Sequence, residues 1–376
     1  MLTLAPAPAW RLLIAGIALY ATAAARADAL VPLPAQSPTV PYPANEWPDV
    51  VQPNVEAIVA RAFTGQRPPA FIRLKAVVVI HRGSLVAERY ATGITRDTRL
   101  QSWSMAKSFL HAALGLAIDD HRINPDTRAP VPEWQNANDP RRQITIRQLA
   151  QMTDGLDFKE DYGDAKAEAM QMLFGTGRGD TGRAAAEAKL GAQPGTRWSY
   201  SSGSANILSR ILRDRLGGRD AYRALLFDKL FAPLGIKTAV PEFDASGTWI
   251  GSSYVHATAR DFARFGLLYL RGGVWEGRQI IPADWVATAR TPTAASNGLY
   301  GALFWLNATD RATGKPAVTP LLPTDTFFAR GFGGQLITIV PSRDAVIVML
   351  SAAYTEDVAP IPKLLGDILN ALPPGG

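Results

Sequence analysis

The chain of 376 residues contains no cysteine and only four histidines. The absence of cysteine excludes disulfide bonds, a thiol nucleophile and thiolate metal sites, and it is compatible with an oxidising compartment. The histidines show no His-Glu-x-x-His motif and no other paired ligand spacing, so a zinc hydrolase is not indicated. We expect neither a metal ion nor an organic cofactor.

The chain also lacks any run of lysine or arginine, and its formal net charge is +6. Such mild, unclustered charge gives no indication of nucleic-acid binding. Apolar residues make up 47% and charged residues 19%, which excludes a disordered chain and a coiled coil. The 32 glycines and 28 prolines are scattered, which excludes a collagen-like fold. The length suggests two domains, or one large domain with an insertion.

The first 27 residues have the pattern of a secretory signal peptide. Arg11 precedes an apolar run from Leu12 to Tyr20, and small residues then lead to an Ala-x-Ala cleavage signature that ends at Ala27. The run is too short to span a membrane, so we predict cleavage after Ala27 and a periplasmic or secreted protein. An uncleaved anchor is the alternative. No later stretch is long and apolar enough to predict a stable membrane span in the cleaved protein.

Strand patterns occur near both ends of the chain. Residues 76–81 and 85–90 predict a hairpin that turns at Arg82-Gly83, and residues 335–340 and 345–350 predict a second pair of strands. Residues 360–372 follow with helical spacing of their apolar side chains.

These elements predict an α/β sandwich, in which one antiparallel sheet from both chain ends is flanked by helices. The proline- and alanine-rich residues 28–53 are expected to form an extended lead-in, and residues 54–376 a single folded domain. A helical subdomain over roughly residues 115–260 is expected as an insertion.

Residues 101–118 carry the strongest chemical signal. Residues 105–118 are good helix formers with an apolar stripe, and Ser104 lies at the start of this predicted helix. Lys107 follows three residues later, so both side chains share one helical face. A serine there lies beside the positive end of the helix dipole, and a buried lysine neighbour can help accept its proton. A lone Ser-x-x-Lys is a weak signal that occurs by chance in many chains, where an N-cap serine and a solvated lysine are the usual explanation.

A Ser-His-Asp hydrolase is the main rival among serine enzymes. It needs a positioned histidine, and the chain has no Gly-x-Ser-x-Gly elbow. His111 lies four residues beyond Lys107 on the same helical side, where a core role is expected. The acidic pair Glu160-Asp161 is interpreted as part of a solvated loop.

Six segments in the order of the chain strengthen the Ser104 interpretation. They are Ser104–Lys107, Ile144–Leu156, Gln193–Ser202, Pro233–Ile236, Ala257–Gly266 and Ala329–Gln335. Together they resemble the serine β-lactamase and penicillin-binding-protein superfamily, in its class C-like branch of 6-aminohexanoate-dimer hydrolases and family VIII esterases. The resemblance covers roughly residues 70–355, with Asp154 in place of a usual serine, and it implies a β-lactamase-like sandwich.

The resemblance implies specific roles for the matching residues. Ser104 would be the nucleophile that forms an acyl-enzyme, and Lys107 and Tyr200 would exchange protons with it. A tyrosine is too weak a base at neutral pH unless a nearby cation stabilises its phenolate. Whether Lys107 or Tyr200 is the general base stays open. The backbone N–H groups of Ser104 and Phe332 would form the oxyanion hole, and Gly331 would allow close backbone approach to the substrate.

Departures from the family pattern affect the expected substrate. Ser202 replaces the asparagine of class C enzymes, and Ala329-Arg330-Gly331 replaces Lys-Thr-Gly, so the β-lactam contacts of that amide and lysine are missing. Tyr162 is a candidate contact for the substrate amine, and Ser202 is a further substrate-binding candidate.

We therefore expect an exported serine hydrolase whose partner is a small-molecule ester or linear amide of the 6-aminohexanoate type. A β-lactamase or DD-peptidase is the alternative within the enzyme class. A non-turnover, penicillin-binding-type sensor is the alternative outside it. The oligomeric state is left open.

Overall fold

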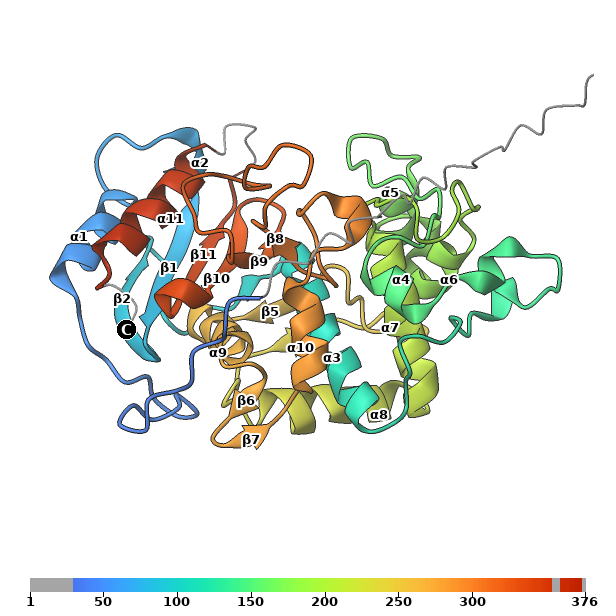
Figure 1. Ribbon diagram of the computed structural model, residues 1–376, viewed down its shortest axis with the longest axis horizontal. Helices are drawn as coiled ribbons and strands as arrows, with labels where there is room; N and C mark the ends of the chain where they lie inside the picture. Colours follow the sequence, from blue (N-terminus) through green and yellow to red (C-terminus); the bar gives the residue numbers. More distant parts are fainter. Residues whose placement is uncertain (1–29, 354–358, 374–376) are drawn as a thin grey trace, which may run out of the picture.

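The computed structural model describes residues 30–353 and 359–373, and its main sheet is built from both ends of the chain (Figure 1). The strands in the described residues are β1 (Leu74–His81), β2 (Ser84–Tyr90), β3 (Leu100–Gln101), β4 (Val240–Pro241), β5 (Val255–Ala257), β6 (Val274–Trp275), β7 (Arg278–Gln279), β8 (Trp305–Leu306), β9 (Phe327–Gly331), β10 (Gln335–Val340) and β11 (Ala345–Ser351).

The helices in the same residues are α1 (Pro53–Arg61), α2 (Pro69–Ile72), α3 (Ala106–Asp119), α4 (Ile146–Ala150), α5 (Glu168–Leu173), α6 (Thr181–Ala186), α7 (Ser202–Leu216), α8 (Arg219–Ala224), α9 (Ala259–Leu270), α10 (Ala283–Arg290) and α11 (Pro360–Ala371). Shorter 3-10 or π turns are η1 (Trp103–Met105), η2 (Pro132–Trp134), η3 (Pro140–Gln143), η4 (Thr176–Gly179), η5 (Leu225–Phe231), η6 (Ala294–Ser296) and η7 (Pro341–Arg343).

The six-stranded sheet has the order β2-β1-β11-β10-β9-β8, and its neighbouring strands run antiparallel. The register pairs Val78 with Val348 and Ile337 with Val348, so strands from opposite ends of the chain lie side by side. The two predicted strand pairs and the C-terminal helix are confirmed. So is the predicted fold class, an antiparallel sheet from both chain ends flanked by helices.

Both faces of this sheet are covered by helices. Val77 and Val79 of β1 pack with α1 and α11 on one face, whereas Val78 and Ile80 join α9 in the larger core on the other. Because both faces are buried, the sequences of β1 and β11 are nearly continuous apolar runs. On α9, a Cβ at Gly266 would lie 2.6 Å from a methyl group of Val346, so glycine lets this helix pack closely against β11.

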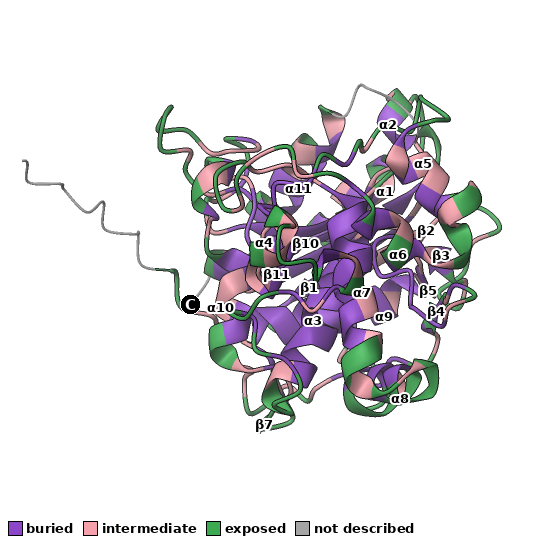
Figure 2. Ribbon diagram, turned by 90° about the vertical axis from the view of Figure 1, so that its right-hand side faces the viewer, coloured by how far each residue is buried: buried purple, intermediate pink, exposed green. Residues whose placement is uncertain are grey.

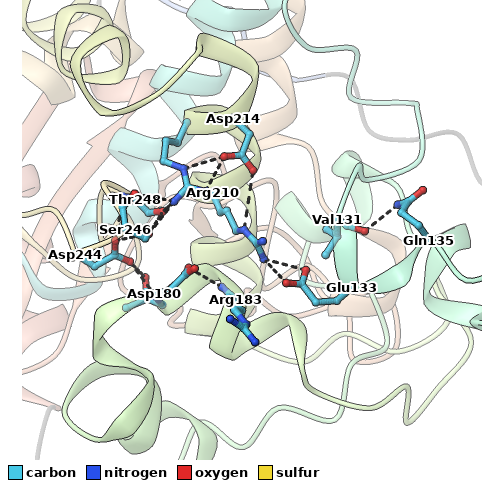
Figure 3. A network of polar contacts seen from close by, with 12 residues as sticks. Val131, Glu133, Gln135, Asp180, Arg183, Arg210, Asp214, Asp244, Ser246 and Thr248 are labelled. Atoms are coloured by element: carbon cyan, nitrogen blue, oxygen red, sulfur yellow. Dashed lines mark hydrogen bonds and ion pairs between the residues drawn. The ribbon is translucent and has the colours of Figure 1, made fainter.

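Helices α4 to α7 lie together at the right-hand end of the molecule in Figure 1, the end that faces the viewer in Figure 2, and α8 lies below them. Helix α7 lies at the centre of this group and carries two arginines into a polar network (Figure 3). Arg210 donates to both carboxylate oxygens of Glu133 at 2.9 Å, and Arg213 donates to the hydroxyls of Ser246 and Thr248 at 2.7 Å. These bonds fix the loops around α7, whose N-terminus carries Ser202.

The proline-rich residues ahead of α1 are held against the body of the protein by arginines of α9 and its C-terminal end. Arg264 donates to the carbonyl oxygens of Pro43 and Asn45, and Arg271 donates to Gln36. The predicted signal peptide lies outside the described residues. Over the ranges that the structure describes, no helix combines the length and hydropathy needed to cross a bilayer.

Candidate active site

Ser104 lies in the 3-10 turn η1, directly before α3. The turn is entered through Trp103, whose φ of 45° is unusual for a residue other than glycine. A pocket of about 440 Å³ opens over this turn. Its lining residues are Trp103, Ser104, Glu160, Tyr162, Met170, Phe174, Tyr200, Ser253, Trp305, Arg330, Gly331 and Phe332. The pocket therefore contains Ser104 together with most of the other residues that the sequence singled out.

Lys107 lies behind Ser104 in the first turn of α3, and its side chain is buried, with 1% of the residue exposed. Its Nζ donates to Ser104 Oγ at 3.1 Å, to Ser202 Oγ at 3.0 Å and to the carbonyl oxygen of Ser252 at 2.9 Å. An ammonium group has three N–H donors, and here each of them has an acceptor. One of the three bonds is directed at the candidate nucleophile.

Tyr200 reaches the same place from the segment that precedes α7. Its ring lies under the Lys107 ammonium, with 4.8 Å between Nζ and the ring centroid. The Trp305 ring packs against the Tyr200 ring, with 5.0 Å between the two ring centroids. The structure therefore brings Ser104, Lys107 and Tyr200 together, although they come from two segments about a hundred residues apart. Their catalytic roles stay a prediction.

Ser202 is fully buried at the start of α7, and its hydroxyl is engaged with protein groups. It accepts from Lys107 and contacts Glu160 Oε1 at 2.5 Å and the Tyr162 hydroxyl at 3.3 Å. Tyr162 is 42% exposed and lines the pocket. Burial and the neighbouring Glu160 carboxylate raise the pKa of Tyr162, so this phenol remains protonated at neutral pH.

Glu160 is the residue of this site that the sequence interpretation missed. It is half-buried and hydrogen-bonded rather than solvated, so the reading of Glu160 as a solvated loop residue is wrong. Its Oε2 accepts from the Ser202 N–H at 2.7 Å, and its Oε1 accepts from the Tyr162 hydroxyl at 2.8 Å. The only signal in the sequence was its place two residues before Tyr162.

The end of β9 closes the pocket beside η1. A Cβ at Gly331 would lie 2.2 Å from the carbonyl oxygen of Ser102, so only glycine lets β9 approach this turn. The Phe332 side chain is 55% exposed, and its ring packs edge-on against Trp103 and beside Tyr162. The segments that carry the two expected oxyanion-hole donors thus lie against each other.

Arg330 adds a positive charge to the pocket wall. Its guanidinium lies 5.0 Å from the centroid of the Trp305 ring, and burial lowers its pKa while the nearby Tyr200 has the opposite effect. Within residues 30–353 and 359–373, it forms no ion pair with a carboxylate. The pocket therefore holds a cation although the lysine of a Lys-Thr-Gly motif is absent.

Two other residues from the sequence analysis have structural roles. His111 is buried and bonded through Nδ1 to the Tyr269 hydroxyl at 2.7 Å, and burial lowers its pKa to about 3, so it is neutral. The expected core role of His111 is confirmed.

Asp154 is buried and accepts from the Ser204 hydroxyl at 2.7 Å and from the Leu156 N–H at 2.9 Å. It connects its turn to the start of α7.

Potential metal ligands are scattered. In the described ranges, no three histidine, aspartate or glutamate side chains come together in a way that would hold a metal ion.

Comparisons with known proteins identify relatives of this chain in sequence and in fold. Residues 72–367 match the sequence model of the family described as Beta-lactamase. The 6-aminohexanoate-dimer hydrolase of Paenarthrobacter ureafaciens is 27% identical over 300 residues, which are 74% of this chain and 72% of that protein.

Two solved structures illustrate the shared fold. A putative 6-aminohexanoate-dimer hydrolase from Bacillus anthracis aligns with a TM-score of 0.68 and 22% identity over 90% of this chain and 89% of its own. A family VIII carboxylesterase aligns with a TM-score of 0.61 and 15% identity over 87% of this chain and 100% of its own. At this identity, the two structures establish similarity of fold.

Proposed function

Because this chain belongs to the Beta-lactamase family, within the serine β-lactamase and penicillin-binding-protein superfamily, we propose that it is a serine hydrolase that acts through an acyl-enzyme on Ser104. Its substrates would be carboxylic esters or small linear amides of the 6-aminohexanoate type. The hydrogen bond of 3.1 Å from Lys107 Nζ to Ser104 Oγ, beside the Tyr200 ring, is the observation that carries the proposal. The relation to an aminohexanoate-dimer hydrolase supports it.

The proposed reaction begins with attack of Ser104 Oγ on the substrate carbonyl carbon. The hydroxyl proton passes to the pair of Lys107 and Tyr200, one of which has to be in its deprotonated form, as an amine or a phenolate, to accept it. The carbonyl oxygen becomes an oxyanion, and the backbone N–H groups of Ser104 and Phe332 are the proposed donors that stabilise it. Proton transfer of this kind contributes about 10²- to 10⁴-fold to the rate.

The tetrahedral intermediate then collapses. The bond to the alcohol or amine breaks, the leaving group takes the proton that Ser104 gave up, and the acyl group stays as an ester on Ser104 Oγ. A water molecule attacks this ester with the same pair as proton acceptor, which releases the acid and restores the Ser104 hydroxyl. The buried Lys107 is held in place for both steps by Ser202 and Ser252.

The residues around the pocket support linear esters and amides, rather than β-lactams, as the proposed substrates. Its wall contains the aromatic rings of Trp103, Tyr162, Trp305 and Phe332. The asparagine and lysine that contact β-lactams in class C enzymes are replaced by Ser202 and Ala329. Ester or linear amide hydrolysis needs neither group. Export to the periplasm or medium is part of the proposal, and the signal-like pattern of residues 1–27 supports it.

Initial hydrolysis rates test this function. The cleaved protein and its Ser104→Ala variant are compared on a short-chain p-nitrophenyl ester, a 6-aminohexanoate dimer and a chromogenic cephalosporin. We expect Ser104-dependent turnover of the ester or the dimer and little turnover of the cephalosporin. Fast cephalosporin hydrolysis would make the protein a β-lactamase. Stable acylation of Ser104 without turnover would make it a sensor.

A further inference from the structure

Glu160 joins three parts of the site through its carboxylate. Oε2 accepts from the backbone N–H of Ser202 at 2.7 Å. Oε1 accepts from the Tyr162 hydroxyl at 2.8 Å and from the Ser202 hydroxyl at 2.5 Å. The carboxylate is therefore bound to both the backbone and the side chain of one residue, Ser202, which lies 42 positions later in the chain.

The bond between Glu160 and Ser202 fixes the direction in which the serine hydroxyl points. A hydroxyl has one proton, and an ionised carboxylate can only accept. Ser202 therefore donates its proton to Glu160, and its lone pairs are left for other partners. The pKa of Tyr162 is raised, which keeps that phenol a donor to the same carboxylate.

The lone pair of Ser202 faces Lys107, whose Nζ lies 3.0 Å away. If Glu160 were an amide or were absent, the Ser202 proton could turn toward Lys107 and compete with its N–H groups. Glu160 thus makes Ser202 an acceptor for the lysine. With the carbonyl oxygen of Ser252 as the second fixed acceptor, the third N–H of Lys107 is directed at Ser104 Oγ.

Glu160 also places a negative charge near a buried cation. Lys107 has no direct ion pair in the part of the chain that the structure describes, and burying an unpaired ammonium is costly. The Glu160 carboxylate is linked to it through a single hydroxyl, that of Ser202. Its charge is therefore separated from the ammonium by one hydrogen-bonding group rather than by bulk water.

We infer that Glu160 is a positioning residue for Lys107, which acts through the Ser202 hydroxyl to hold the lysine against Ser104. This inference rests on the proposed function. It assigns Ser202 a place in the proton-transfer machinery, between Glu160 and Lys107. Glu160 itself does not touch the reacting atoms in this arrangement.

The test compares Glu160→Gln, Ser202→Ala and the double variant on a short-chain p-nitrophenyl ester. The matched control is Asp161→Asn, which removes a charge from the neighbouring, exposed position. Among the described residues, the Asp161 carboxylate accepts from the Gly163 N–H alone. We expect Glu160→Gln to lower kcat about 10- to 100-fold with KM changed less than threefold. The control should keep kcat within twofold.

The double variant separates a linked pair from two independent residues. If Glu160 acts through Ser202, the double variant should be no less active than the less active of the two single variants. The second change then removes an interaction that is already broken. Losses that multiply, or equal losses in Glu160→Gln and Asp161→Asn, would overturn the inference. Glu160→Asp should recover part of the lost kcat, since it restores a carboxylate.

A second readout does not depend on turnover. A fluorophosphonate probe modifies a reactive serine by forming an O–P bond with loss of fluoride, and the rate of this step reports the nucleophilicity of Ser104. We expect slower modification in Glu160→Gln and an unchanged rate in Asp161→Asn, with far-UV circular dichroism and thermal unfolding to show that each variant is folded. Normal labelling of Glu160→Gln would overturn the inference and leave the proposed function standing. A wild-type protein without Ser104-dependent hydrolysis would refute the function instead.

Discussion

The Lys107 ammonium lies over the face of the Tyr200 ring, 4.8 Å from its centroid. The position of this ring is set by aromatic neighbours, with Trp305 at 5.0 Å and Tyr300 at 6.1 Å between ring centroids. A cation held against the ring is electrostatically favourable and keeps the Tyr200 ring beside Lys107. The contact therefore couples the lysine of α3 to the tyrosine that precedes α7.

Replacement of Tyr200 by phenylalanine tests whether its hydroxyl carries protons. The ring contacts remain, so the fold should be preserved, and we expect kcat to fall about 10²- to 10⁴-fold with KM little changed. Tyr300→Phe is the matched control, because Tyr300 is a buried neighbour that does not line the pocket around Ser104. Steady-state kinetics on a p-nitrophenyl ester measure both. A loss of less than threefold in Tyr200→Phe would rule out this role.

Gly331→Ala tests the approach of β9 to the turn that holds Ser104. The added Cβ would lie 2.2 Å from the Ser102 carbonyl oxygen, so the strand has to move away from η1. Displacement of the proposed oxyanion donors by about 1 Å should cost on the order of 10²-fold in kcat/KM. Gly179→Ala is the control, because a Cβ there would meet no atom within 4 Å. Equal kcat/KM values for Gly331→Ala and Gly179→Ala would contradict the assignment of the end of β9 to the active site.

His111 should make the protein less stable at acidic pH. Burial lowers its pKa from 6.5 to about 3, so below pH 6.5 the unfolded chain takes up a proton that the folded protein does not. The free energy of unfolding should therefore fall as the pH is lowered from 6.5 toward 3, by up to about 1.4 kcal/mol per pH unit for this group. Burial also lowers the pKa of His81, to about 4, which adds a second contribution of the same sign.

Urea unfolding between pH 7 and pH 4.5 measures this slope. His111→Gln should be less stable than the wild type at pH 7, because the hydrogen bonds of His111 to Tyr269 and Thr288 change. Its free energy of unfolding should nevertheless fall less steeply with decreasing pH, because the contribution of His111 is missing. The exposed His121, changed to Gln, serves as the control and should keep the full slope. An unchanged slope in His111→Gln would show that this group does not cause the acid sensitivity.

Asp154 should have the opposite dependence on pH. Burial raises its pKa, against the opposing effect of the Ser204 hydroxyl, so the folded protein favours the protonated carboxyl. Stability from this group is present at low pH and lost as the pH rises through the folded pKa. We expect Asp154→Asn to raise the free energy of unfolding at pH 7, because the neutral amide removes a charge that burial disfavours. The difference should shrink toward pH 4. The exposed Asp97→Asn should show neither effect.

The sequence was informative where the cause is local. Buried strands such as β1 and β11 have apolar side chains on both faces, so their residues form continuous apolar runs that can be read directly. The Ser104 and Lys107 pair is equally local, since three residues along a helix place two side chains on one face. The expected sheet from both chain ends followed from the same runs.

The contacts that complete the site are not local, and the sequence did not predict them. Glu160 meets Ser202 across 42 positions, and only its place two residues before Tyr162 distinguishes it in the sequence from Asp161, which is exposed. The lead-in was expected to be extended, but its attachment by Arg264 and Arg271 depends on side chains more than two hundred residues away. Such pairs are fixed by the tertiary fold, which brings distant polar groups together.

Detection of the acyl-enzyme is the most direct test of the central claim. The protein is mixed with a p-nitrophenyl ester, quenched in acid within milliseconds to seconds, and digested with trypsin. The peptide of residues 100–107 contains Ser102 and Ser104, and fragmentation distinguishes them. We predict one acyl group on Ser104, which disappears with time as product forms and is absent from Ser104→Ala. An adduct on another residue, or undiminished hydrolysis by Ser104→Ala, would contradict the account.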